Sequence, residues 1–264
     1  MTRVLVVVPT YEERGTIAEL VAAVRTGAAA PDVLVVDDAS PDGTGDVADA
    51  LAAADTSVHV LHRPAKAGLG PAYRAGLRWG LDHGYDVLVE MDADLSHDPA
   101  ELPALLSALA GADVVIGSRY VAGGDVRRWT SGRLALSTWG NRYVRGMTGL
   151  PVRDATSGYR AFRAAVLQAI AVDELTSDGY AFQVETALRA WRAGFTIREV
   201  PITFVERREG ASKLSRRVVV EAAWRVPAWS LGTRTLSRRP GEVHPDSVVR
   251  ERRGGASPPS PSTR

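Results

Sequence analysis

Short apolar runs alternate with longer segments of helical periodicity along the first half of the chain. The apolar runs predict strands, and the periodic segments between them predict helices. The expected strands cover residues 4–8, 33–36, 58–61, 87–91 and 114–117, and the expected helices cover residues 13–25, 44–54, 71–81 and a segment that starts at Asp98-Pro99. Strands that alternate with helices in this way predict a parallel sheet with helices on both faces.

The second half of the chain has a less regular pattern. It predicts helices over residues 134–148, 164–171 and 182–193, and strands over residues 159–162 and 196–204. Because proline has no backbone donor, Pro201 places the last of these strands at a sheet edge. A final helix is expected over residues 214–231, bent or broken at Pro227. Its aliphatic, aromatic and arginine residues suit a membrane interface, although an amphipathic helix packed on the domain would have the same pattern.

Composition sets the expected domain organisation. Residues 237–264 are rich in Pro, Gly, Ser and Arg, so they bury too little apolar surface to offset the cost of ordering and are expected to be disordered. Residues 1–236 are then expected to form a single α/β domain. No apolar run approaches the roughly 20 residues of a membrane span, so any membrane contact is expected to be peripheral.

Charge and cysteine content narrow the possible functions. The net charge of +1 argues against a general nucleic-acid-binding protein. The chain has no cysteine, which excludes disulfides and thiolate chemistry and fits a cytoplasmic protein.

Polar segments follow each of the first five expected strands. These segments are residues 9–13, 37–44, 63–70, 92–94 and 118–120. In an open parallel sheet, ligands bind beyond the carboxyl ends of the strands. The sequence therefore predicts a ligand site at this edge of the sheet.

Asp92-Ala93-Asp94 places two carboxylates directly after the fourth expected strand. Mg²⁺ and Mn²⁺ prefer oxygen ligands and often share one or two carboxylates with a substrate diphosphate. The hydroxyl of Ser96 could supply a further oxygen. A solvated loop would show the same short motif, so Asp-x-Asp alone leaves both interpretations open. Asp98 is expected to cap the next helix, and His97 to be an ordinary loop residue.

Asp37-Asp38 follows the second expected strand and begins the segment DDASPDGT. An acid at a strand end can accept hydrogen bonds from a ribose or a base, although the same residues are typical of a turn. The nearby loop of residues 66–70 could bring backbone amides close to a phosphate, but it does not have the P-loop pattern.

Seven segments occur in an order that resembles glycosyltransferase family two, and within it the polyprenol-phosphate mannosyltransferases. They are VVVPTYEE, VVDDASPDGT, KAGLGPAYRAGLRWG, VEMDADLSHDP, VIGSRYVAGG, DATSGYRAFR and REGASKLS. The resemblance covers about residues 4–229. It implies a Rossmann-like GT-A fold, a nucleotide-sugar donor that is most often GDP-mannose, Mg²⁺ or Mn²⁺ as cofactor, and a polyprenyl phosphate acceptor.

The resemblance also implies roles for individual residues. Those expected to line the guanosine pocket are Pro9, Tyr11, Glu13, Val36 and Asp38. Those expected to meet the diphosphate, the metal and the mannose are Asp92, Ala93 and Asp94, with Ser96 as a further metal ligand where relatives often have Gln. The basic residues expected to hold phosphates of the donor or the acceptor are Arg119, Arg133 and Lys213.

The expected chemistry is displacement at the anomeric carbon of the sugar. A cation held by Asp94, with Lys213 nearby, would stabilise the charge that develops on the leaving GDP. Arg119 and Arg133 would aim a phosphate oxygen of the acceptor at the opposite side of C1, which predicts inversion to a β-linked product. The nucleophile is already ionised, so no strong general base is needed.

The expected location is the cytoplasmic face of a membrane, reached peripherally or through a membrane-protein partner. Three alternatives stay open from the sequence. One is the same reaction with glucose or another sugar. Another is transfer to a protein or polysaccharide, and the last is a nucleotide-sugar-binding module without catalysis.

Overall fold

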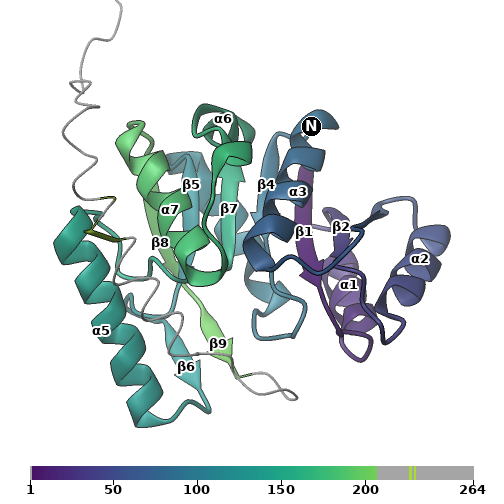
Figure 1. Cartoon of the computed structure of the whole chain (residues 1–264), viewed down its shortest axis with the longest axis horizontal. Helices are drawn as coiled ribbons and strands as arrows, with labels where there is room; N and C mark the ends of the chain where they lie inside the picture. The colour runs from purple at the N-terminus through teal and green to yellow at the C-terminus, as the bar shows by residue number, and fades with distance from the viewer. Residues whose placement is uncertain (1, 207–225, 228, 230–264) are drawn as a thin grey trace, which may run out of the picture.

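The computed structural model describes residues 2–206, 226–227 and 229, in which a seven-stranded sheet lies between two layers of helices (Figure 1). The strand order is β3-β2-β1-β4-β7-β5-β8. The strands are β1 (Val4–Thr10), β2 (Asp32–Asp37), β3 (Val58–His62), β4 (Val87–Glu90), β5 (Val114–Ser118), β7 (Arg160–Arg163) and β8 (Ile197–Pro201). The predicted α/β fold with a mostly parallel sheet is confirmed, and β8 is the edge strand expected from Pro201.

The helices cover the two faces of this sheet. α1 (Ile17–Thr26), α2 (Thr44–Ala54) and α4 (Leu102–Ala108) lie on one face, and α3 (Leu69–Asp82), α6 (Ala164–Ala169) and α7 (Gly179–Arg192) lie on the other. α5 (Ser131–Thr148) lies at the side of the sheet (Figure 1). Short 3₁₀ helices cover Pro99–Glu101, Leu109–Gly111 and Val172–Glu174. No helix among residues 2–206 combines the length and apolar composition needed to cross a membrane.

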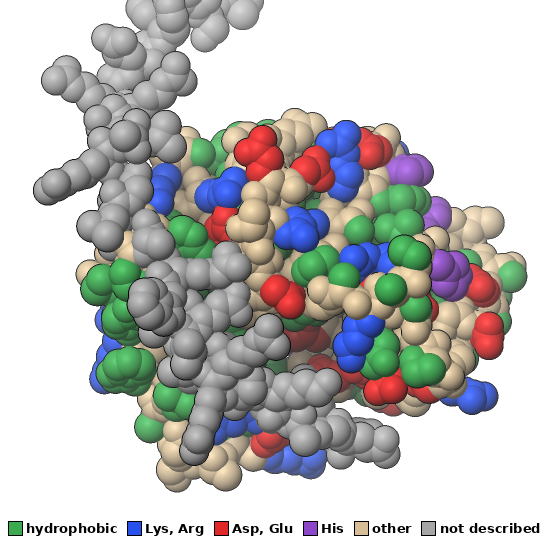
Figure 2. Space-filling view, viewed as in Figure 1, with side chains coloured by type: hydrophobic (Ala, Val, Ile, Leu, Met, Phe, Trp, Pro, Cys, Tyr) green, Lys and Arg blue, Asp and Glu red, His purple; other side chains and the backbone are tan. Residues whose placement is uncertain are grey.

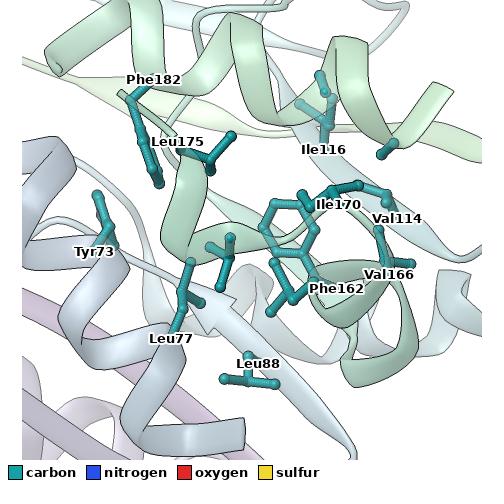
Figure 3. Packing of buried hydrophobic residues seen from close by; sticks show 14 of the residues in the cluster. Tyr73, Leu77, Leu88, Val114, Ile116, Phe162, Val166, Ile170, Leu175 and Phe182 are labelled. Carbon is teal, nitrogen blue, oxygen red and sulfur yellow. The ribbon is translucent and has the colours of Figure 1, made fainter. Parts of the chain in front are cut away.

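Burial on both faces explains why β1, β2, β4 and β5 contain continuous apolar runs. In β1, Leu5 and Val7 pack toward α3, whereas Val6 and Val8 pack toward α1. Figure 3 shows the first of these two cores, in which Leu77, Phe162 and Phe182 come together from α3, β7 and α7. Strands buried in this way need apolar side chains at successive positions, not at alternate ones.

The direction of β7 is the main feature that the sequence pattern did not predict. β7 occupies the expected segment, but it runs antiparallel to both neighbours, β4 and β5. Its first residue therefore lies at the sheet edge where β4 and β5 end. The segment before β7, residues 154–158, is brought to that edge as a result.

The expected strand over residues 196–204 is divided in two. Ile202 is buried in the core and its backbone N–H donates to the Ser118 carbonyl at 3.1 Å. The chain then leaves the main sheet, and β9 (Thr203–Val205) pairs in parallel with β6 (Asp125–Arg127), a strand that was not predicted. This small second sheet lies next to α5 (Figure 1).

Helix boundaries agree with local capping. Asp98 accepts a hydrogen bond from the Ala100 N–H at 2.9 Å, which confirms its predicted role as a cap. Thr130 caps α5 by accepting from the Arg133 N–H, so this helix begins at Ser131, three residues before the expected start. Most of the expected helix over residues 214–231, and the expected disordered tail from residue 237, lie outside the described residues.

Candidate active site

Three loops at the carboxyl edge of the sheet contain a residue other than glycine with a left-handed backbone. They follow β1, β2 and β4, and the residues are Glu12 (φ 61°), Ala39 (φ 55°) and Leu95 (φ 59°). Such conformations cost free energy and concentrate where a loop must present groups to a ligand. The same edge carries the residues that the sequence assigned to a donor nucleotide and a metal.

The loop after β4 presents the two carboxylates of Asp92 and Asp94, both partly exposed, on either side of the buried Ala93. The left-handed Leu95 turns the chain so that the Ser96 N–H donates to Asp94 Oδ1 at 3.0 Å. The Ser96 side chain is buried, and its Oγ has no hydrogen-bond partner among the described residues. The Val205 N–H donates to the Ser96 carbonyl at 3.2 Å, which ties this loop to β9.

His97 lies in this loop as predicted, but it is buried and shapes the loop. Its Nδ1 accepts from the Asp92 N–H at 3.2 Å, and its ring stacks on Tyr159 with centroids 5.0 Å apart. Burial lowers the pKa of His97 below 6.5, although Asp92 and Asp94 act in the opposite direction. A neutral imidazole is required here, because Nδ1 must accept a hydrogen bond.

The residues expected to line a nucleoside pocket come from the ends of β1 and β2. The strand register pairs Pro9 with Val36, and the Asp38 N–H donates to the Thr10 carbonyl at 3.0 Å. Tyr11 follows, with the Lys66 ammonium 3.3 Å from the centroid of its ring. The side chain of Val36 is fully buried against α3, so only its backbone faces the edge.

Asp38 holds the loop of residues 63–70 against the end of β2. Its carboxylate accepts from the Ala67 N–H at 3.0 Å and the Gly68 N–H at 3.3 Å, and it also pairs with Arg63. The loop therefore lies against Asp38, one of the residues predicted to line a nucleoside pocket. Acceptance of hydrogen bonds from a ribose or a base by Asp38 stays a prediction.

Arg119 follows β5 and is buried in a bidentate pair with Asp154. Its Nε and Nη2 atoms lie 2.7 Å from the two carboxylate oxygens of Asp154, and Nη2 also donates to Thr156 at 2.8 Å. Burial opposes both charges, but the pairing outweighs it: the pKa of Asp154 falls below 3.8, and the pKa of Arg119 rises. The sequence missed Asp154, which lies within the quoted segment DATSGYRAFR but is far from Arg119 along the chain.

Arg133 lies in the first turn of α5 and forms an ion pair with Glu206, the residue after β9. Its guanidinium lies 4.1 Å from the centroid of the Trp129 ring. The Arg119 guanidinium lies 5.3 Å from the same ring. Trp129 therefore brings together the two arginines that the sequence assigned to phosphates, while Lys213 lies outside the described residues.

Phe204 of β9 joins this arginine cluster to the carboxylate loop. Its ring lies 5.7 Å from the His97 ring, and the Arg119 guanidinium lies 5.5 Å from its centroid. Carboxylates that suit a cation and guanidinium groups that suit phosphates thus flank one short strand. The predicted metal and phosphate residues, apart from Lys213, are gathered on one side of the sheet edge.

The oxygen atoms of Asp92, Asp94 and Ser96 are hard ligands of the type that Mg²⁺ and Mn²⁺ prefer. In the part of the chain that the structure describes, no three or more His, Asp or Glu residues are grouped so as to hold a metal by themselves. A cation here would need further oxygen ligands, and a diphosphate supplies them. The residues present fit a metal that is shared between protein and substrate.

A mostly parallel sheet that carries an Asp-x-Asp loop at the carboxyl end of a central strand defines the GT-A class of glycosyltransferases. The chain belongs to glycosyl transferase family 2, whose pattern its sequence matches over residues 5–171.

Two similar proteins and one solved structure support this assignment. The sequence is 55% identical over 232 residues to an undecaprenyl-phosphate mannosyltransferase of Micrococcus luteus, a match that covers 88% of this chain and 96% of that protein. It is 51% identical over 243 residues to a polyprenol monophosphomannose synthase of Mycolicibacterium smegmatis, covering 91% of each. The fold resembles glucosyl-3-phosphoglycerate synthase from Mycobacterium tuberculosis in complex with Mn²⁺, UDP and glucosyl-3-phosphoglycerate. The TM-score is 0.60 at 20% identity, covering 88% of this chain and 79% of that chain.

Proposed function

We propose that this chain transfers mannose from GDP-mannose to a polyprenyl phosphate and uses Mg²⁺ or Mn²⁺. The observation that carries the proposal is the 55% identity, over nearly the full length of that protein, to an undecaprenyl-phosphate mannosyltransferase. The site supports it, because carboxylates for a cation and two arginines for phosphates flank β9. The Mn²⁺-bound structure of similar fold supports the use of a divalent cation.

The residues of the chain divide the work between donor and acceptor. Asp92 and Asp94 would hold the cation, which supplies positive charge to the diphosphate that leaves. Tyr11, Asp38 and the loop of residues 63–70 enclose the nucleoside. On the other side of the carboxylate loop, Arg133 binds the phosphate of the acceptor, and for this Glu206 must give up its ion pair.

The nucleophile needs no proton removed by the protein, because one oxygen of a phosphate monoester is ionised at neutral pH. His97 does not serve as a general base, because its imidazole is buried and its Nδ1 accepts a hydrogen bond from the Asp92 N–H. Attack from the side opposite the diphosphate gives a β-linked product from an α-linked donor. Orientation and charge stabilisation are the contributions left to the protein.

The test of the proposed function is a comparison of labelled donors. The protein is incubated with Mg²⁺ or Mn²⁺, undecaprenyl phosphate and, in separate reactions, labelled GDP-mannose, GDP-glucose or UDP-glucose. We expect label in the lipid fraction from GDP-mannose when undecaprenyl phosphate is the acceptor. We expect no label when undecaprenol is used instead of undecaprenyl phosphate. Faster labelling from either glucose donor would contradict the proposed sugar, and labelling of undecaprenol would contradict the proposed acceptor.

We propose further that the chain docks peripherally on the cytoplasmic face of the membrane through α5. Of the exposed large hydrophobic residues that the structure describes, all but Leu69 lie on this helix: Leu134, Leu136, Trp139 and Met147. Trp139 is 59% exposed and stacks on Tyr143. Figure 2 shows hydrophobic and basic side chains together at the left of the molecule, over α5.

The spacing along α5 supports a lipid surface as its partner. Leu136, Trp139, Tyr143 and Met147 recur every three or four residues, which places them on one side of the helix. Arg142 is exposed at the border of this face, so its charge complements anionic lipid headgroups. Asn141 and Val144 face the domain instead.

Flotation with anionic liposomes tests α5. Replacing Leu136 and Trp139 together with Ser is expected to lower the membrane-bound fraction by at least about tenfold, because two apolar side chains no longer enter the bilayer. Leu69→Ser is the matched control, since Leu69 is 39% exposed but lies on α3. If the double variant floats as well as the wild type, α5 is not the contact.

A further inference from the structure

The carboxylate of Asp92 is held by a side chain that the sequence did not mark as part of the site. The Tyr73 hydroxyl of α3 donates to Asp92 Oδ1 at 2.9 Å. Tyr73 is fully buried, and its ring is parallel to that of Phe182 in α7 with centroids 6.0 Å apart. Figure 3 shows these two residues on neighbouring helices.

Gly158 lies close to the same carboxylate. A Cβ atom at this position would lie 3.5 Å from each carboxylate oxygen of Asp92 and 3.6 Å from the His97 ring. The backbone before β7 therefore lies in contact range of the carboxylate, while His97 holds the Asp92 backbone N–H. Together these contacts restrict rotation of the Asp92 side chain, and the phenol selects one orientation through a hydrogen bond.

The helix that carries the phenol is itself fixed in place. At its start, the Gly70 N–H donates to Asp178 Oδ1 at 2.6 Å, and Arg74 donates to the Leu175 carbonyl. Further along, Gly76 and Gly80 let α3 lie directly on β1 and β4, because a Cβ at Gly76 would be 2.4 Å from Val7. A functional group needs this kind of support to be placed with sub-ångström precision.

The phenol acts as the donor in this hydrogen bond. Burial raises the pKa of Tyr73 well above 10, and the negative charges of Asp92, Glu90 and Asp94 raise it further. The phenol therefore stays protonated, and the Asp92 carboxylate accepts.

We propose that Tyr73 is a positioning residue, whose hydroxyl holds Asp92 in the orientation that binds the divalent cation together with the donor diphosphate. This inference rests on the metal site of the proposed function. Residues that hydrogen-bond to a metal ligand fix its direction and commonly change metal affinity by about 10–100-fold when they are replaced.

The test compares Tyr73→Phe with Tyr85→Phe in the full chain. Phe keeps the buried ring and removes only the hydroxyl. Tyr85 is a matched control, because it is also buried and its hydroxyl donates to a carboxylate, Asp32 Oδ2, at 2.7 Å. Asp32 begins β2, so this second pair lies at the amino ends of the parallel strands, away from the candidate site at their carboxyl ends.

Mn²⁺ binding is measured by electron paramagnetic resonance with GDP present and without acceptor. We expect Tyr73→Phe to bind Mn²⁺ about 10–100-fold more weakly than the wild type and Tyr85→Phe to bind it equally well. In transfer assays, Tyr73→Phe should need more metal for half-maximal rate, with an unchanged KM for polyprenyl phosphate.

Unchanged Mn²⁺ affinity in Tyr73→Phe would overturn the inference, as would equal losses in both variants, which indicate a general loss of stability. A wild-type protein that binds no Mn²⁺ would overturn the metal site and this inference with it. A wild-type protein that binds Mn²⁺ and GDP but transfers no mannose would overturn the proposed function only, and the comparison of affinities would still decide the role of Tyr73.

Discussion

Replacing Asp94 with Asn is expected to lower the rate of mannosyl transfer by about 10²–10³-fold, the cost of removing one group that stabilises charge in a transition state. The substitution exchanges a carboxylate for a neutral amide of the same shape, so the cation that would oppose charge on the leaving GDP is held less tightly. The loop should keep its shape, because an Asn Oδ1 can still accept from the Ser96 N–H. The expected loss is therefore chemical and not structural.

Initial rates of labelled lipid formation measure this effect, with Mn²⁺ varied at saturating GDP-mannose. Asp98→Asn is the control, because Asp98 lies four residues further on, is exposed and caps the next 3₁₀ helix. Both variants should unfold at about the wild-type temperature, and only Asp94→Asn should lose transfer. A wild-type rate for Asp94→Asn would show that this carboxylate does not serve the metal.

β1, β2, β4 and β5 were predictable because each is buried on both faces and therefore contains an unbroken apolar run, whereas β3 is half-buried and has His59 within its run. The direction of β7 was not predictable, since a short apolar segment has the same local pattern in either direction. β6 was missed for another reason. Its residues, Asp125–Arg127, are exposed or half-buried and form no apolar run, so only pairing with β9 makes them a strand.

Some predicted site residues have positions that follow from the ends of strands, whereas Arg133 and Lys213 were expected from the family resemblance alone. Asp38, Asp92 and Asp94 belong to the first group, and the structure brings them to one edge. Tyr73 and Asp154 do not, because their partners are distant in sequence. Tyr73 meets Asp92 from α3, and Asp154 meets Arg119 only because β7 enters the sheet antiparallel at the ligand edge. Such contacts depend on tertiary structure, to which a single sequence gives no direct access.

Arg119 lies directly after β5, as the sequence predicted, and its binding of a phosphate stays a prediction. The sequence placed it after β5 and assigned it to a phosphate, and the structure places it within the cluster around Trp129. In its bidentate pair with Asp154, the Nε and Nη2 atoms of Arg119 each donate a hydrogen bond to a carboxylate oxygen. Arg119 therefore also stabilises the fold through Asp154. Replacing Asp154 tests this stabilising contribution without removing Arg119.

Replacing Asp154 with Asn is expected to lower the free energy of unfolding by about 3–5 kcal/mol, the cost of leaving a buried charge without its partner. Asp154 is fully buried and Arg119 nearly so, and solvent cannot replace the carboxylate that both guanidinium nitrogens contact. An Asn side chain can accept one hydrogen bond but carries no charge. Urea denaturation followed by circular dichroism measures the loss.

Asp173→Asn is the matched control, because Asp173 also pairs with an arginine, Arg78, but both side chains are about half exposed. Exposed pairs contribute only about 0–1 kcal/mol, so this variant should unfold close to the wild type. Equal losses in the two variants would contradict a special role for the buried pair.

The pH dependence gives a second test of the buried pair with a definite sign. Because the pKa of Asp154 is lowered in the folded protein, its contribution to stability is complete above the unfolded value of 3.8 and is lost as the pH falls through the folded value. The difference in unfolding free energy between the wild type and Asp154→Asn should therefore be constant near neutral pH and shrink once the pH falls below 3.8. A difference that stays constant through this acidic range would mean that lost packing, and not lost charge, destabilises the variant.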